Sequence, residues 1–352
     1  MKKFKLKSFL NVIIAAFCVL TFAFLFMSSL TESMDFARVI VYSVLGCLIT
    51  LFANIFLHEI FHLIFGAFAG LKFSELQLFF LNFKKKGKKI KFKFKGADGV
   101  FGYSLMATDN PDGAMKKYVV SSFGGLLISF LIIVSQVVIS LSVKDLFLVV
   151  AIGNTLPISV YIFLINLLPV FENNDGSLIY LYAMGGEKKA TCENYFKAVA
   201  LLNSGVEPSN LDSKYLIKSD ADFTYGAKIA YLRYLAYITS DEEEAFKELY
   251  SLSDLSKHQD MYDEIFEEMF FSAILMDDKK FIKNNENYAM KIFENPIRPQ
   301  TFRVHASYRV YTEELDWAKL IVDSGISFCE DYEVKGIAKA EKSYLEIIKN
   351  KI

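Results

Sequence analysis

Cysteine and histidine are scarce in this 352-residue sequence, and their placement limits the kinds of site that it can form. The four cysteines, Cys18, Cys47, Cys192 and Cys329, are scattered, and no two of them have the C-x-x-C spacing. We therefore expect neither a disulfide framework nor a cysteine-ligated zinc site, as suits a soluble part that faces a reducing cytoplasm. Only four histidines occur, and two of them fall within five positions of the chain.

Charged residues are nearly absent from long stretches of the first half of the chain. Hydrophobic residues make up 53% of the sequence, a fraction typical of a membrane protein. After about Gly185 the chain becomes charged and rich in helix-forming residues, an asymmetry that the net charge of −1 conceals. We predict an N-terminal span and outer loop (residues 1–36), a membrane core (37–184) and a soluble domain (185–352).

Four apolar runs are long enough to cross a bilayer, which requires about 20 residues. They cover approximately residues 9–27, 39–71, 118–141 and 146–168. No small-x-small cleavage site follows the first run at Ser28–Thr31, so we expect this run to remain as a span and not to be removed as a signal peptide. The predicted fold class is therefore an α-helical membrane protein with about four spans.

A lysine-rich segment separates the second run from the third. Between Lys72 and Lys117 there are eleven lysines and four acidic residues, so the positive-inside rule predicts that this segment is cytoplasmic. With four spans, the N-terminus and the C-terminal domain of this cell-membrane protein are then cytoplasmic as well. The lysines are expected to meet lipid headgroups of the bilayer, and no nucleic-acid partner is expected.

The same segment has the alternation of β-strands. Apolar residues alternate with lysines from Lys89 to Lys95, which predicts a strand with one apolar and one basic face. Residues 73–83 are the expected partner, through a turn at Gly87, and residues 100–106 are expected to form a third strand. A small β-sheet at the membrane surface follows from this pattern.

Three stretches of the C-terminal half place an acidic turn between two helical segments. They are Ile238–Phe246, Leu275–Lys283 and Val310–Ala318, and they recur every 35 to 37 residues. This spacing is typical of tetratricopeptide-like helical hairpins. We therefore expect residues 185–352 to form an all-α helical-hairpin domain that binds a peptide or protein partner.

The two clustered histidines belong to the sequence His58-Glu59-Ile60-Phe61-His62, an H-E-x-x-H motif inside the second apolar run. On a helix the two imidazoles lie on one face and can reach one metal ion, while Glu59 can approach water at that ion. The alternative is a pair of interfacial histidines on an ordinary membrane helix. Ionisable residues at membrane depth are costly and are usually functional, which favours Zn²⁺ ligands at His58 and His62 and a catalytic carboxylate at Glu59.

A catalytic zinc site needs a third protein ligand and an open position for water. If the second run enters from outside near Ala37, a helical rise of about 1.5 Å per residue carries His58 about 30 Å inward. The third ligand must lie at that depth, just past the end of the fourth run. Asp175 fits this position, with Glu172 as the competing candidate, and Gly176 favours Asp175 because it permits a tight turn.

The motifs together resemble those of the site-2 protease family of intramembrane zinc metalloproteases. The H-E-x-x-H motif is followed about a hundred residues later by Asn166-Leu167-Leu168-Pro169 and then Asp175-Gly176, where the family has N-x-x-P-x-x-x-x-D-G. The resemblance covers roughly residues 39–176; the gap before Asp175 is one residue longer than the commonest family spacing. It implies His58, His62 and Asp175 as zinc ligands, Glu59 as the catalytic carboxylate, and Asn166 as an aid to substrate or oxyanion binding.

The predicted function is therefore hydrolysis of peptide bonds in membrane-anchored proteins or peptides, with residues 37–184 as the metalloprotease core. The alternative is a membrane adaptor whose helical domain recruits a partner and whose metal site is vestigial or structural. Glu59 argues against the alternative, because a structural zinc site does not need that carboxylate.

Overall fold

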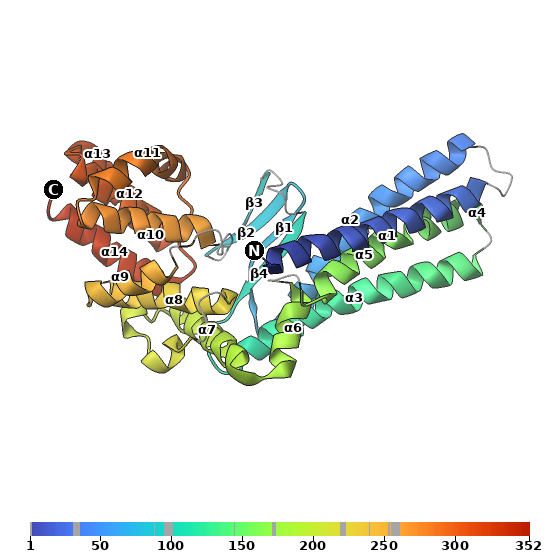
Figure 1. Cartoon of the computed structure of the whole chain (residues 1–352), viewed down its shortest axis with the longest axis horizontal. Helices are drawn as coiled ribbons and strands as arrows, with labels where there is room; N and C mark the ends of the chain where they lie inside the picture. The colour runs from blue at the N-terminus through green and yellow to red at the C-terminus, as the bar shows by residue number, and fades with distance from the viewer. Residues whose placement is uncertain are drawn as a thin grey trace. The chain divides into compact units, whose positions relative to one another are not determined.

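The computed structural model describes residues 2–30, 36–87, 89–94, 101–143, 145–170, 174–218, 223–238, 240–252, 254 and 261–352. These residues are mostly helical, with one small β-sheet (Figure 1). The chain divides into two compact units. Unit 1 comprises Met1–Met106 and Lys116–Met184, and unit 2 comprises Ala107–Met115 and Gly185–Ile352.

Unit 1 contains four helical segments that are long and apolar enough to cross a membrane, counted over the described residues. They are Phe9–Ser29 within α1 (Lys2–Leu30), α2 (Phe36–Phe68), α3 (Ala114–Ser142) and a fourth segment, Val149–Leu167, made of η1 (Val149–Gly153) and α5 (Leu156–Leu167). The short helix α4 (Leu146–Leu148) precedes the fourth segment. The expectation of four apolar helices is thus confirmed. The fourth is not a continuous α-helix, because η1 is a π-helix and Asn154 and Thr155 form a turn before α5.

The buried face of α2 is polar, and its outward face is apolar. The buried residues recur mostly at steps of four: Val39, Ser43, Gly46, Thr50, Asn54, His58, Glu59, His62 and Gly66. Thr50 shares a hydrogen bond of 2.9 Å with Thr155, and the amide of Asn54 donates to Ser159 at 2.8 Å. A helix that hides its hydrogen-bonding groups and exposes its hydrocarbon is suited to lipid surroundings.

The small sheet contains strands β1 (Lys72–Leu78), β2 (Leu81–Lys86), β3 (Lys89–Phe94) and β4 (Gly102–Ala107), in the order β3-β2-β1-β4. The prediction of one strand over residues 73–83 is wrong: β1 and β2 are joined by a turn at Phe79, whose φ is 54°. Antiparallel pairing sets Phe83 opposite Phe92 across β2 and β3. The expected strand at residues 100–106 is confirmed as β4, which lies at an edge of the sheet.

Unit 2 is helical in all of its described regular structure. Its α-helices are α7 (Gly186–Ser204), α8 (Thr224–Tyr237), α9 (Glu242–Ser251), α10 (Tyr262–Leu275), α11 (Lys279–Glu294), α12 (Pro299–Tyr311), α13 (Leu315–Glu330) and α14 (Lys335–Lys349), with short 3-10 turns at η2 (Pro208–Asn210) and η3 (Ser213–Leu216). Each acidic turn singled out in the sequence joins two helices, α8 to α9, α10 to α11 and α12 to α13. Asp241 and Asp278 cap the second helix of their pairs by accepting from backbone N–H groups.

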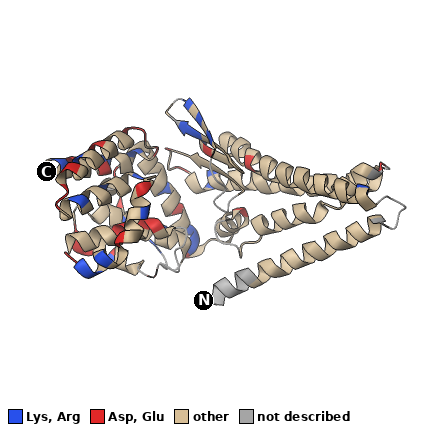
Figure 2. Ribbon diagram, turned by 90° about the horizontal axis from the view of Figure 1, so that it is seen from above, with Lys and Arg blue, Asp and Glu red and all other residues tan. Residues whose placement is uncertain are grey.

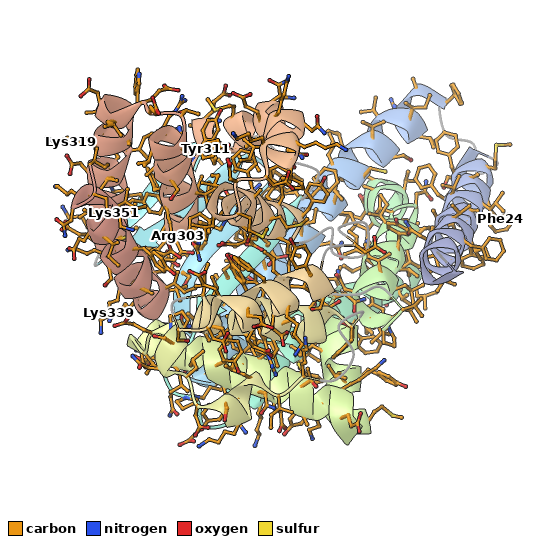
Figure 3. All side chains as sticks on the ribbon, turned by 60° about the vertical axis from the view of Figure 1, so that its left-hand side comes forward. Phe24, Arg303, Tyr311, Lys319, Lys339 and Lys351 are labelled. Atoms are coloured by element: carbon orange, nitrogen blue, oxygen red, sulfur yellow. The ribbon has the colours of Figure 1, made fainter. Side chains whose placement is uncertain are left out.

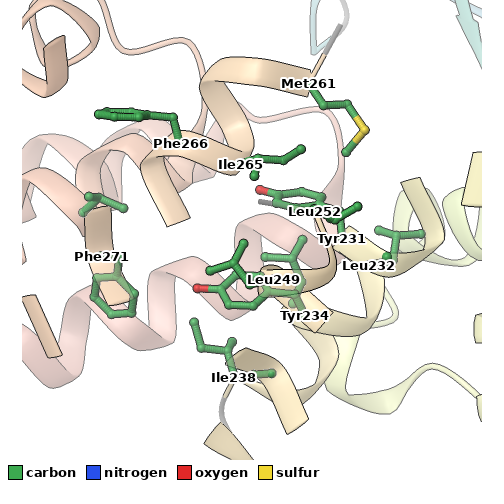
Figure 4. Close-up of a cluster of buried hydrophobic side chains, with 14 of the residues drawn as sticks. Tyr231, Leu232, Tyr234, Ile238, Leu249, Leu252, Met261, Ile265, Phe266 and Phe271 are labelled. Atoms are coloured by element: carbon green, nitrogen blue, oxygen red, sulfur yellow. The ribbon is translucent and has the colours of Figure 1, made fainter. Parts of the chain in front are cut away.

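The two units differ in how they use charge and apolar side chains. Lys, Arg, Asp and Glu are distributed over unit 2 and are concentrated in unit 1 on the β2–β3 hairpin, whereas the long helices carry few of them (Figure 2). In unit 2, Lys319 and Lys351 project outward while Arg303 lies among the helices (Figure 3). The hydrophobic core of unit 2 brings side chains of α8, α9 and α10 together around Tyr234, Leu249 and Ile265 (Figure 4).

Candidate metal centre

Three side chains from two helices, two buried histidines and the partly buried Asp175, converge inside unit 1. His58 and His62 project from the same face of α2, and Asp175 is the first residue of α6 (Asp175–Met184). The Nε2 atoms of the two histidines are 3.0 Å apart, and each lies 3.2 Å from Oδ2 of Asp175. We call this group of three residues the metal centre.

The spacing of these three atoms matches a tetrahedral ion. Zinc–nitrogen and zinc–oxygen bonds are about 2.0–2.1 Å long, so neighbouring ligand atoms of a tetrahedral zinc are about 3.3 Å apart. The observed separations of 3.0, 3.2 and 3.2 Å are close to that value. Three protein ligands leave the fourth position for water or substrate, as in catalytic zinc sites.

The hydrogen bonds of the two imidazoles determine which nitrogen faces the centre. Nδ1 of His62 lies 2.8 Å from the carbonyl oxygen of Ser121, and Nδ1 of His58 lies 3.0 Å from that of Gly125. A carbonyl only accepts, so each Nδ1 carries the hydrogen and each Nε2 presents a lone pair. Two lone pairs and a carboxylate oxygen then face one another in a buried space, an arrangement that repels itself unless a cation lies between them.

Helix α3 supports the histidines through residues that we did not identify from the sequence. Ser121, Gly125 and Ser129 recur at steps of four, and Oγ of Ser129 lies 2.9 Å from Nδ1 of His58. A Cβ atom at Gly125 would lie 2.4 Å from Nε2 of His62, so only glycine allows α3 to approach this closely. The regular spacing of small residues along this helix was the signal available in the sequence.

Asp175 is positioned by the residues on either side of it. The side chain of Asn174 donates to the carbonyl oxygens of Ile165 and Leu168 at 2.7 and 2.8 Å and accepts from the backbone N–H of Ser177 at 2.8 Å. It thereby ties the end of α5 to the start of α6. Gly176 is needed for a different reason from the one predicted: its φ is not positive, but a Cβ there would lie 1.7 Å from the carbonyl oxygen of Leu167. Glu172, the competing candidate, lies outside the described residues.

Glu59 is buried at 8% exposure, and its side chain lies near the first residue of β4. It follows His58 on α2, about 100° around the helix axis. A Cβ atom at Gly102, the first residue of β4, would lie 3.2 Å from Cγ and 3.5 Å from Oε1 of Glu59. The edge strand of the sheet therefore starts beside this carboxylate.

The side chain of Asn166 is hydrogen-bonded within α5, and its expected role toward a substrate stays a prediction. Its side-chain amide donates to the carbonyl oxygen of Ile162 at 3.1 Å, one turn earlier in α5. That helix ends at Leu167, two residues before Pro169, which cannot continue an α-helix without a break. Asn166 is thus on the last turn of α5, and Asn174 makes the bridging contacts near Asp175.

No protein-family model, no curated protein and no solved structure matches this chain. The function must therefore be argued from the residues of the metal centre and their surroundings. Chemically, the centre could offer two imidazole nitrogens and one carboxylate oxygen to an ion, a set that suits zinc, and Glu59 is the residue next to His58 in α2.

Proposed function

We propose that this protein is an intramembrane zinc metalloprotease that hydrolyses peptide bonds of membrane-anchored proteins or peptides. The observation that carries the proposal is the convergence of His58, His62 and Asp175 within 3.2 Å of one another, with both histidines on a helix of membrane-spanning length. The carboxylate of Glu59, adjacent in sequence to His58, supports a catalytic role for the site. A structural zinc site is normally closed by four protein ligands.

The residues divide the chemistry between them. His58, His62 and Asp175 would hold the zinc ion, which acidifies water and polarises a peptide carbonyl when it is bound at such a site. Glu59 takes the proton from the attacking water and delivers it to the leaving amine. Ser121, Gly125 and Ser129 keep the two imidazoles in the tautomer and orientation that ligation requires.

The edge strand β4 is the proposed docking position for the substrate. A transmembrane helix must unwind before cleavage, because its peptide groups are hydrogen-bonded internally. An extended segment of the substrate can then add to β4 as a further strand. Because β4 begins at Gly102, close to the side chain of Glu59, this segment would pass beside the catalytic carboxylate. Proline substitutions at Tyr103, Ser104 and Leu105 should each reduce cleavage, and unchanged cleavage in all three would exclude strand addition here.

We further propose that α1, α2, α3 and the fourth segment cross the cell membrane, with both termini cytoplasmic. The basic β2–β3 hairpin is placed on the cytoplasmic side by the positive-inside rule. Unit 2 would be a tetratricopeptide-like module, because its hairpins recur at a spacing typical of such repeats. In this proposal unit 2 binds a peptide or protein partner and the membrane part performs the chemistry.

Zinc content tests the metal centre without knowledge of a substrate. The full chain would be purified in detergent, and bound zinc per chain measured for the parent, Asp175→Ala, Glu59→Gln and the control Asp145→Ala, which alters an exposed carboxylate. We expect near-stoichiometric zinc in all but Asp175→Ala. Zinc that is equally retained in Asp175→Ala would remove Asp175 from the site.

Proteolysis is tested by comparing cells that produce the parent chain with cells that produce Glu59→Gln. New N-termini, identified by mass spectrometry of labelled membrane proteins, should map to membrane-spanning segments and should require Glu59. A zinc-loaded parent with no Glu59-dependent cleavage would instead favour a membrane adaptor with a structural metal site.

A further inference from the structure

The β2–β3 hairpin carries lysines on one face and, apart from Lys85 opposite Ile90, apolar residues on the other. On one face Lys84 stands opposite Lys91, and Lys93 stands opposite Asn82. On the other face Phe83 stands opposite Phe92, and Leu81 opposite Phe94. Like charges directly opposite each other destabilise a sheet, so the basic face needs a source of negative charge.

The protein supplies only part of that charge. Glu75 of β1 pairs with Lys84 at 3.3 Å; burial opposes ionisation of Glu75, but hydrogen bonds from Tyr103 and Asn82 help to hold its pKa below the usual value. No acidic residue in the described part of the chain pairs with Lys89, Lys91 or Lys93. All three are exposed on β3, which is an edge of the sheet.

The apolar face of the sheet and α2 line an open cavity of about 390 Å³. Its lining is entirely apolar and includes Phe52, Phe56, Leu76, Leu78, Phe83 and Ile90. A cavity without polar groups does not hold water well. At about 30 Å³ per methylene group, close to the volume of a water molecule in the liquid, it has room for roughly a dozen such groups.

The cavity opens where hydrocarbon is expected. Phe52 and Phe56 belong to the membrane-length helix α2, and Phe56 lies twenty residues after the first residue of that helix, Phe36. At a rise of about 1.5 Å per residue this is about 30 Å, the thickness of the hydrocarbon core of a bilayer. Ile90, Phe92 and Phe94 are 63%, 48% and 75% exposed, which is unfavourable in water but not beside acyl chains.

We infer that the β2–β3 hairpin and α2 form a binding site for one anionic phospholipid. An acyl chain occupies the cavity, and the phosphate-bearing headgroup is held by Lys89, Lys91 and Lys93. Because β3 is an edge strand, the lipid can pass around it from the apolar to the basic face, and Ile90, which lines the cavity, lies between two of the lysines. The apolar cavity would bind the acyl chain of the lipid. The lysines, which lack acidic partners among the described residues, would select a lipid with a negatively charged headgroup.

Retained lipid tests the inference without reference to zinc or proteolysis. The full chain would be reconstituted in equimolar phosphatidylcholine and phosphatidylglycerol and re-extracted in mild detergent, and the bound phospholipid counted by mass spectrometry. Two variants test the two halves of the site. The lysine variant combines Lys89→Gln, Lys91→Gln and Lys93→Gln and tests the headgroup half. Ile90→Phe narrows the mouth of the cavity and tests the acyl-chain half. The control carries Lys283→Gln, Lys319→Gln and Lys351→Gln, an equal loss of exposed positive charge from unit 2.

We expect about one phosphatidylglycerol per chain in the parent and the control, and at least a fivefold loss in the lysine variant and in Ile90→Phe. Size-exclusion profiles and melting temperatures equal to those of the parent would show that each variant is folded. Equal retention of both lipids, no retained lipid, or the same loss in the control would each overturn the inference. Displacement of the lipid by an apolar peptide but not by excess anionic lipid would assign the cavity to a protein segment instead.

Discussion

The two units bury charge in opposite ways. In unit 2 Arg303 is fully buried, and its guanidinium donates to Glu268 and Glu341 at 2.7 Å each. Tyr234 also donates to Glu268, at 2.6 Å. In unit 1 the candidate metal centre brings a carboxylate and two imidazoles together, with no lysine or arginine of the described residues paired to Asp175. The buried charges of unit 2 are thus paired with lysine, arginine or tyrosine partners of the same chain, whereas the three residues of unit 1 form a set that could hold a metal ion.

The burial of the Arg303 cluster also costs folding free energy. Its Nη1 atom has no hydrogen-bond partner among the described residues, although the guanidinium lies 4.3 Å from the ring centre of Phe271. Burial also raises the pKa of Glu341, despite the adjacent arginine. Such a cluster adds little net stability but becomes strongly unfavourable when one member is removed.

The largest effect should follow from removal of that arginine. Arg303→Met leaves Glu268 and Glu341 buried without their cation, so we expect unit 2 to lose about 3–5 kcal/mol of unfolding free energy. Trp317, the single tryptophan of the chain, lies in α13 and reports the unfolding of unit 2 by its fluorescence in a denaturant titration. Zinc content should not change.

A matched control is the exposed ion pair of Lys349 and Asp323, which has the same 2.7 Å separation. Because both side chains are about half exposed, Lys349→Met should cost no more than about 1 kcal/mol. An effect of Arg303→Met as small as that of Lys349→Met would break the comparison, since burial would then make no difference.

The next effect concerns the space around His62. In Gly125→Ala the added methyl group would lie 2.4 Å from Nε2 of His62, so the imidazole or α3 must move. We expect zinc affinity to fall by about 100-fold or more, because a ligand displaced by a fraction of an ångström no longer fits the ion. A chelator competition would measure this. Gly153→Ala, where the added carbon meets only Ser140 at 3.1 Å or more, should bind zinc like the parent.

A smaller effect is expected from the hydroxyl of Ser129. Ser129→Ala removes one of the two groups near Nδ1 of His58, and the carbonyl of Gly125 remains as an acceptor. We therefore expect about a tenfold loss of zinc affinity, the low end of the range for residues that orient a metal ligand. Unchanged affinity would mean that the Gly125 carbonyl alone orients the ring.

Part of this site could be read from the sequence, because part of it is local. The spacing of His58 and His62 determines their common face on any helix, and nothing distant is needed. The position of Asp175 depends on how α6 packs against α5, through Asn174 and the contact of Gly176 with Leu167. The expected depth in the membrane limited the candidates for the third metal ligand to Asp175 and Glu172. It gave no information on the packing of α6 against α5.

Two features of the structure were missed in the sequence, because the local sequence carries no clear signal for either of them. The small residues of α3 recur visibly, yet a periodic stripe does not reveal which helix it faces. Phe79 adopts a φ of 54°, a conformation unusual for an aromatic residue, so no turn residue marked the division between β1 and β2. The four apolar helices were predictable because their length and composition are themselves the signal.

The smallest predicted effect concerns His305, a partly buried group of unit 2 that forms no ion pair with an acidic residue of the described part of the chain and has no place in the candidate metal centre. His305 stacks on Phe293 at 4.4 Å and accepts from Arg309, and burial together with the nearby charge of Arg309 lowers its pKa to about 4. Between pH 6.5 and 4 the unfolded chain binds a proton that the folded chain does not, so unit 2 should lose stability as the pH falls. After allowance for partial exposure, the loss is on the order of 1 kcal/mol. The difference in Trp317-monitored unfolding between the parent and His305→Gln should therefore change across this range; a constant difference would show that His305 titrates normally and that unit 2 tolerates buried charge without a partner.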